Sequence, residues 1–171
     1  MLETAREMFG YTPNIVVEMS NNVATTKAYL TLQSVLREHG TLTLQEQEIT
    51  MLAAAAWHRC EYSMAAHRTG AKRAGIAQAD IDRISRLEIP ADARLQALTA
   101  ATWALMDTEG FLGGEDLETF DELGIEKAQL YEIVALIAME LIAHCVDAIE
   151  KTPLDAAILS QRVRANSDGR H

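Results

Sequence analysis

The stretch EITMLAAAAWHRCEYSMAAH, residues 48–67, decides both the fold and the candidate chemistry of this chain. Its alanine-rich first half is typical of a closely packed helix. Cys60, Ser63 and His67 then follow at the spacing i, i+3 and i+7, which places their side chains on one face of a second helix. Glu48 lies twelve residues before Cys60, in the preceding helix. The stretch therefore predicts two consecutive helices that present a carboxylate, a thiol, a hydroxyl and an imidazole.

These four groups suggest a reactive thiol. If a helix begins at Cys60, its free backbone N–H groups and the positive end of its dipole favour an ionised sulfur, as does a neighbouring imidazolium. We expect His67 to be the proton partner of the thiol and Glu48 to orient the imidazole, the role of the third group in a catalytic triad. Ser63 stands where a second sulfur would complete a Cys-x-x-Cys pair, so Cys60 cannot close a local disulfide.

The remaining sequence also has helical periodicity, with no strand-like alternation of useful length. A capping-box pattern at Thr43–Glu46 marks one helix start, and Asp92 is suited to cap another. We expect an all-α fold that forms a single domain over residues 1–171, with a frayed tail at 165–171. The expected helices cover residues 14–20, 22 or 25 to 39, 43–58, 60–75, 78–87, 92–110, 115–123 and 126–150, with a short final helix that begins at Pro153.

Composition narrows the class of protein. The chain has 171 residues, is 49% hydrophobic, and carries a net charge of −10 with a pI near 4.9. Nucleic-acid partners and anionic membrane surfaces both call for basic patches, so neither is expected. The sequence has no apolar run of the ~18 residues expected of a membrane span, and residues 1–7 do not read as a secretory signal. Two cysteines in such a chain predict a reduced, cytoplasmic setting.

The arrangement resembles the alkylhydroperoxidase D-like and carboxymuconolactone decarboxylase-like superfamily. The family form is Glu, eleven residues, Cys-x-x-Cys, three residues and His. The similarity covers roughly residues 30–158 and includes Gly75-Ile76 and the ending Thr152-Pro153-Leu154-Asp155. It implies an all-helical homo-oligomer, a trimer or a hexamer, that reduces hydroperoxides with two cysteines, a proton-relay histidine and a glutamate, without a cofactor.

Glu48, Cys60 and His67 match the family pattern, and Ser63 departs from it. The leading prediction is a peroxiredoxin-type peroxidase in which Cys60 is oxidised to a sulfenic acid and Ser63 donates a hydrogen bond to the thiolate or to a bound peroxide. An external thiol or Cys145 would then reduce the sulfur. A buried structural cysteine is the plainer interpretation of an isolated thiol in an apolar helix.

Two other interpretations remain open. In one, His67 and Glu48 perform cofactor-free acid–base chemistry on a small carboxylated substrate, and a basic residue among Arg59, Arg68 and Lys72 holds the carboxylate. In the other, the chain is a redox-inactive oligomeric module. A metal site is not expected, because one sulfur and one histidine on a shared face fall short of the four ligands that zinc usually takes.

Overall fold

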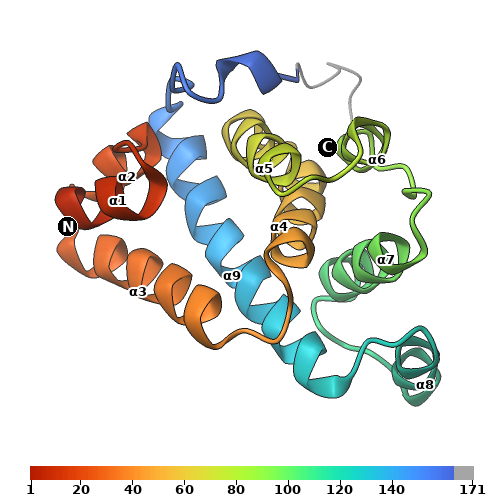
Figure 1. Cartoon of the computed structure of the whole chain (residues 1–171). Helices are drawn as coiled ribbons and strands as arrows, with labels where there is room; N and C mark the ends of the chain where they lie inside the picture. Colours follow the sequence, from red (N-terminus) through yellow and green to blue (C-terminus); the bar gives the residue numbers. More distant parts are fainter. Residues whose placement is uncertain (164–171) are drawn as a thin grey trace.

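Helix α4 (Leu44–His58) lies at the centre of the structure and contacts α5, α6, α7 and α9 (Figure 1). It is buried from Gln47 to Ala56, and its alanines let the surrounding helices approach closely. From Met51 to Ala56 every residue is apolar and buried, and a helical segment that is apolar on every side is expected in a core rather than at a surface. The alanine-rich sequence that precedes Cys60 therefore builds the centre of the fold.

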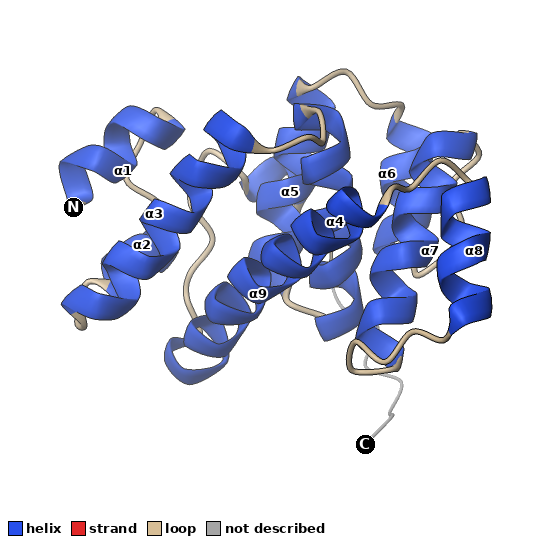
Figure 2. Ribbon diagram, turned by 90° about the horizontal axis from the view of Figure 1, so that it is seen from below, coloured by secondary structure: helices blue, strands red, loops and turns tan. Residues whose placement is uncertain are grey.

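The computed structural model describes residues 1–163, and within them the chain forms α-helices and one short 3₁₀ helix, with no strand (Figure 2). The all-α prediction is confirmed; the tail at 165–171 lies outside the described residues. The helices are α1 (Leu2–Phe9), α2 (Asn14–Met19), α3 (Val23–His39), α4 (Leu44–His58), α5 (Glu61–Arg73), α6 (Gln78–Ser85), α7 (Ala93–Asp107), α8 (Gly114–Glu122), α9 (Lys127–Glu150) and the 3₁₀ helix η1 (Leu159–Gln161).

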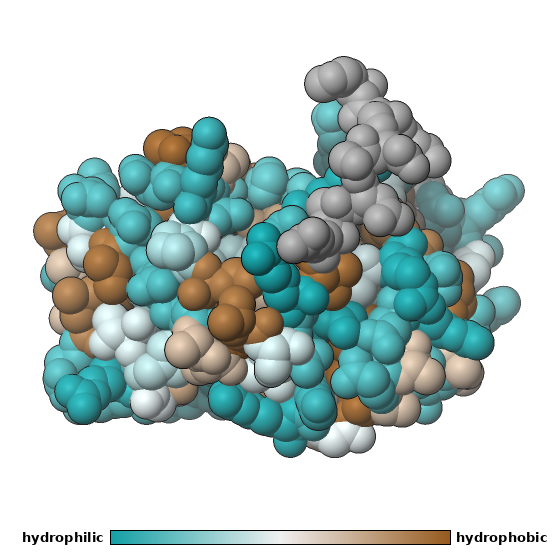
Figure 3. All heavy atoms as spheres, turned by 90° about the horizontal axis from the view of Figure 1, so that it is seen from above, coloured by the Kyte–Doolittle hydropathy of each residue, from teal (hydrophilic) through white to brown (hydrophobic). Residues whose placement is uncertain are grey.

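The long helix α9 runs beside α4 and separates two groups of shorter helices. Helices α1, α2 and α3 lie on one side of it, and α6, α7 and α8 lie beyond α4 on the other side (Figure 1). No helix formed by residues 1–163 combines the length and the hydrophobicity needed to cross a membrane. The face seen in Figure 3 is largely polar, with apolar side chains gathered in small patches.

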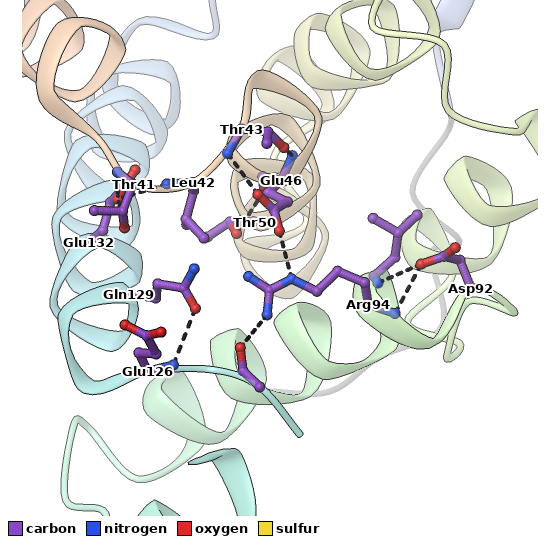
Figure 4. A network of polar contacts seen from close by, with 12 residues as sticks. Thr41, Leu42, Thr43, Glu46, Thr50, Asp92, Arg94, Glu126, Gln129 and Glu132 are labelled. Atoms are coloured by element: carbon purple, nitrogen blue, oxygen red, sulfur yellow. Dashed lines mark hydrogen bonds and ion pairs between the residues drawn. The ribbon is translucent and has the colours of Figure 1, made fainter. Parts of the chain in front are cut away.

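The predicted helix caps are present. The Thr43 hydroxyl accepts a hydrogen bond from the amide of Glu46, and the Glu46 carboxylate accepts one from the amide of Thr43, at 3.3 and 2.7 Å. The Asp92 carboxylate caps α7. Arg94 links the two helix starts, because its Nε donates to Glu46 Oε1 at 2.6 Å (Figure 4). In the loop between α3 and α4, the amide of Thr41 donates to the buried carboxylate of Glu132 at 2.6 Å, which holds the loop in place.

Two predictions at the ends of the chain need correction. Helix α1 was not predicted, and no helix begins at Pro153; after α9 the chain is irregular until η1. Tertiary contacts explain the irregular segment. The Asp155 carboxylate accepts hydrogen bonds from the Asn14 amide, at 3.1 Å, and from the Tyr62 hydroxyl. This residue therefore ties the C-terminal segment to α2 and α5 instead of supporting a helix of its own.

Candidate functional site

A buried histidine held between two carboxylates forms the centre of the candidate site. His67, on α5, has its Nδ1 3.0 Å from Glu48 Oε2 and its Nε2 3.1 Å from Glu140 Oε2. The two glutamates are 6% and 2% exposed and come from α4 and α9. Arg37, in the last turn of α3, donates from Nη2 to Glu48 Oε1 at 2.6 Å. The predicted contact between Glu48 and His67 is confirmed.

This arrangement makes His67 a cation at neutral pH. Burial alone would lower the pKa of His67, but hydrogen bonds to Glu140 and Glu48, and the charges of both, outweigh burial and raise that pKa to about 9. Burial would likewise raise the pKa of Glu48, yet His67 and Arg37 hold it below its ordinary value. Both imidazole nitrogens therefore act as donors, which is the imidazolium form.

The close approach of α5 to α4 depends on Gly70. A Cβ built at this position would lie 2.5 Å from Glu48 Cδ and closer still to the carboxylate oxygen that His67 contacts. Gly70 stands one helical turn after His67, so the same stretch of α5 delivers the imidazole and leaves room for the carboxylate. The sequence Ala66-His67-Arg68-Thr69-Gly70 thus sets the local geometry.

A cavity of about 530 Å³ opens onto this network. Arg37, Glu48, Ser63 and His67 form its polar wall, and α1, α2 and the turn between them contribute apolar side chains such as Phe9. Small-molecule sites are usually concave, mostly apolar and equipped with a few convergent polar groups. The cavity has these properties, so we take it as the candidate active site.

Cys60 does not take the form that the sequence predicts. It is the N-cap of α5, as expected, but it is 3% exposed and the described lining of the cavity does not include it. Its Sγ lies 3.3 Å from Asp147 Oδ2, to which the thiol donates. Burial raises the pKa of Cys60 to about 12, and the charges of Glu140 and Asp147 add to this rise against hydrogen bonds from Ser63 that lower it.

The expectation of a thiolate stabilised by His67 is therefore wrong for this structure. Both ring nitrogens of His67 contact carboxylates, and two acids face the sulfur where a cation was expected. Cys145, the other cysteine, is exposed, and both thiols are free. Ser63, in contrast, lines the cavity and also acts to lower the pKa of the Cys60 thiol.

The basic residues at the site also differ from those predicted. Arg68 turns away and pairs with Asp82 at 2.6 Å, and neither Arg59 nor Lys72 lines the cavity within the described residues. Arg37 and Arg73 line it instead. Arg73 is the neighbour of the predicted Lys72 on α5, whereas Arg37 comes from α3, outside the motif, and could not be inferred from nearness in sequence.

Glu140 was missed for a related reason. It interrupts the buried stripe of α9 that includes Ile133, Leu136 and Ala143, and an acid at a core position of an apolar helix signals a buried charge pair. The sequence contains that signal, but it does not identify His67 as the partner 73 positions earlier.

Comparison with known proteins supports the fold. Residues 24–105 match the model of the Carboxymuconolactone decarboxylase family. The structure is similar to an uncharacterized peroxidase-related protein with an alkylhydroperoxidase AhpD core from Ralstonia eutropha JMP134 (TM-score 0.82, 17% identity, 96% of this chain and 88% of that chain). It is also similar to an uncharacterized peroxidase-related protein from Silicibacter sp. TM1040 (TM-score 0.76, 18% identity, 92% and 84% of the two chains).

A third similar structure is a variant of the debrominase Bmp8 in complex with 2,3,4-tribromopyrrole (TM-score 0.74, 16% identity, 94% of this chain and 86% of that chain). At these identities the likenesses establish a shared fold. No curated protein sequence matches the chain.

Proposed function

We propose that this chain is a member of the alkylhydroperoxidase D-like and carboxymuconolactone decarboxylase-like superfamily, and that its cavity binds a small carboxylated organic substrate for cofactor-free acid–base catalysis. His67 is the proposed proton donor, Glu48 and Glu140 are its positioning residues, and Arg37 is the proposed carboxylate-binding residue. The observation that carries the proposal is the 2.6 Å contact between Arg37 and Glu48 in the wall that also presents the charged His67.

The proposed chemistry follows from the charge state of the site. Arg37 uses one N–H group on Glu48, which leaves other donors of its guanidinium for a substrate oxygen. In a decarboxylation, the bond from carbon to a carboxylate breaks and CO₂ leaves. The electron pair left on carbon takes the imidazolium proton that Nδ1 shares with Glu48, since Glu48 and His67 both line the cavity. Solvent then restores that proton. A histidine whose pKa is raised to about 9 is mostly protonated at pH 7, as a proton donor must be.

Ligand pairs test the binding step without any mutation. The wild-type protein is expected to bind benzoate about tenfold more tightly than benzamide, a neutral molecule of the same shape, because a charge-assisted hydrogen bond contributes roughly 1.5 kcal/mol. Isothermal calorimetry measures both affinities. Arg37→Met should remove the preference, whereas Arg86→Met, on an exposed arginine paired with Glu88, should preserve it. Equal wild-type affinities for the two ligands would contradict the proposal.

The catalytic step is tested by CO₂ release from a set of small carboxylic acids. For any acid that the wild type turns over, His67→Gln is expected to lower kcat by about 100-fold, the usual contribution of a positioned general acid. Binding should be retained, because Arg37 is unchanged. Turnover that survives His67→Gln would exclude His67 as the proton donor.

A second candidate, the thiol-dependent reduction of hydroperoxides, is favoured by Ser63, which lines the cavity and also acts on the pKa of Cys60. In that reaction a pair of thiols reduces the peroxide to an alcohol and water and closes a disulfide. We expect the wild type to consume tert-butyl hydroperoxide slowly, because the pKa of Cys60 is raised to about 12 and the thiolate is the reactive form. The reaction is followed with a dithiol reductant present.

Ser63→Cys should raise this consumption by at least about tenfold, because it places a second sulfur on the cavity wall beside Cys60. Combining it with Cys60→Ser is the control that removes the pair again. Rapid consumption by the wild type that is lost in Cys60→Ser would instead favour the peroxidase over the acid–base enzyme.

We also propose that the chain forms a homo-oligomer. Helix α9 exposes Tyr131, Val134, Leu141 and Ile149, which are 65%, 47%, 44% and 76% exposed. Exposed apolar residues along one helix are typical of protein interfaces. Light scattering of the full chain measures the mass; a monomer at micromolar concentration would contradict this proposal.

A further inference from the structure

One face of α3 forms a wall of the cavity. Tyr29, Gln33 and Arg37 are spaced i, i+4 and i+8, which places them one above the other on a helix. All three line the cavity. Tyr29 and Gln33 are only 8% and 4% exposed overall, and both belong to the lining of the cavity. The wall therefore presents a hydroxyl, an amide and a guanidinium in sequence.

Neither the Gln33 amide nor the Tyr29 hydroxyl has a hydrogen-bond partner within residues 1–163, and neither is among the fully enclosed polar groups, so both stay open to the cavity. A ligand that fills the cavity without pairing with the amide would leave it buried and unpartnered, which is costly. Gln47 is a buried amide with a structural role, and it is hydrogen-bonded within the protein: its Nε2 donates to Leu36 O at 2.9 Å and to Glu132 Oε1 at 3.1 Å. The contrast indicates that Gln33 and Tyr29 are reserved for a ligand.

We propose that Gln33, assisted by Tyr29, recognises a hydroxyl or carbonyl group of the substrate at the end remote from the carboxylate that Arg37 binds. This inference rests on the proposed function and specifies its substrate class. A helix rises about 1.5 Å per residue, so Gln33 lies about 6 Å from Arg37 along the axis of α3. That spacing suits a six-membered ring with a carboxylate and a neutral oxygen at opposite positions.

The remaining lining is consistent with a flat ligand. Phe9 and Tyr11 contribute aromatic rings to the same cavity. Aromatic side chains pack well against planar rings in offset or edge-on arrangements. The substrate class is therefore a small planar carboxylic acid that carries a hydroxyl or keto oxygen across the ring from the acid.

Calorimetry with benzoate, 4-hydroxybenzoate and 2-hydroxybenzoate tests this assignment. We expect the wild type to bind 4-hydroxybenzoate about tenfold more tightly than benzoate, since a buried amide left unpaired penalises the ligand that lacks the oxygen. The 2-hydroxy isomer should bind no better than benzoate, because its hydroxyl lies beside the carboxylate. Gln33→Met should abolish the preference by tightening benzoate binding, because no amide is then left unpaired, while Gln96→Met, on the exposed side of α7, should leave the preference intact.

The outcomes separate the two proposals. If benzoate and 4-hydroxybenzoate bind equally well to the wild type, the role of Gln33 is overturned and the proposed function stands. If benzoate does not bind at all, the carboxylate site itself is overturned, and this inference with it. A preference that survives both Gln33→Met and Tyr29→Phe would also overturn the assignment, because another group would then supply the contact.

Discussion

Gly70→Ala is expected to lower the free energy of unfolding by about 4 kcal/mol, even though alanine stabilises an exposed helix by about 1 kcal/mol relative to glycine. The new methyl group would overlap the Glu48 carboxylate. A free glutamate could swing aside, but this one is held by Arg37 and His67 in a site where it is 6% exposed. Displacing it leaves a buried imidazolium without one of its two partners, and breaking a buried charge pair typically costs 3–5 kcal/mol.

Chemical denaturation followed by circular dichroism measures the change, and Gly114→Ala is the matched control. Gly114 is also helical, in the first turn of α8, and a Cβ there meets nothing within 4 Å. The control should be neutral or slightly stabilising. If Gly70→Ala were as stable as the control, the close approach of α5 to Glu48 would not be a constraint on the fold.

Stability should also fall as the solution becomes alkaline. The folded-state pKa of His67 is raised to about 9 from the ordinary value of 6.5. The stabilisation that comes from this raised pKa is present in full below pH 6.5, where His67 is protonated in both the folded and the unfolded protein. It is lost as the pH rises through about 9, where the folded protein also loses the proton. Since one pKa unit corresponds to 1.36 kcal/mol, we expect a decrease of about 3 kcal/mol between pH 7 and pH 10.

Denaturation at several pH values in this window gives the profile, and His67→Gln provides the comparison, because it removes the titrating group and should flatten the curve. Nuclear magnetic resonance of the imidazole C–H of His67 gives the pKa directly. A titration near 6.5 would show that the two carboxylates do not hold the proton, and it would remove the basis for His67 as a proton donor at pH 7.

Local signals account for the parts of the fold that the sequence predicts. The capping box at Thr43 and the cap at Asp92 depend on residues within one helical turn, so their boundaries could be placed. The pairing of Glu48 with His67 was predictable because both lie in one motif. Segment 153–158 was not, since its conformation depends on Asp155 meeting Asn14 and Tyr62 from distant helices.

The prediction for Cys60 failed because it considered only the helix on which the thiol sits. The start of α5 does favour an ionised sulfur, and Ser63 contributes hydrogen bonds in that direction. However, α9 places Asp147 and Glu140 near the sulfur. Their negative charges, together with burial, raise the pKa of Cys60 by more than Ser63 lowers it. Sequence spacing within the motif contains no information about charges contributed by a helix more than 70 residues later.

The hydrogen bond from the Asn14 amide to Asp155 joins positions 141 residues apart, and this separation affects the order in which the protein folds during synthesis. Chains are synthesised from the N-terminus, and early segments begin to fold first. Helices α1 and α2 therefore emerge from the ribosome long before the residue that anchors them. A polypeptide that ends near residue 150 would contain every α-helix of the structure. It would lack Asp155, however, and with it the hydrogen bond that ties α2, part of the cavity wall, to the C-terminal segment.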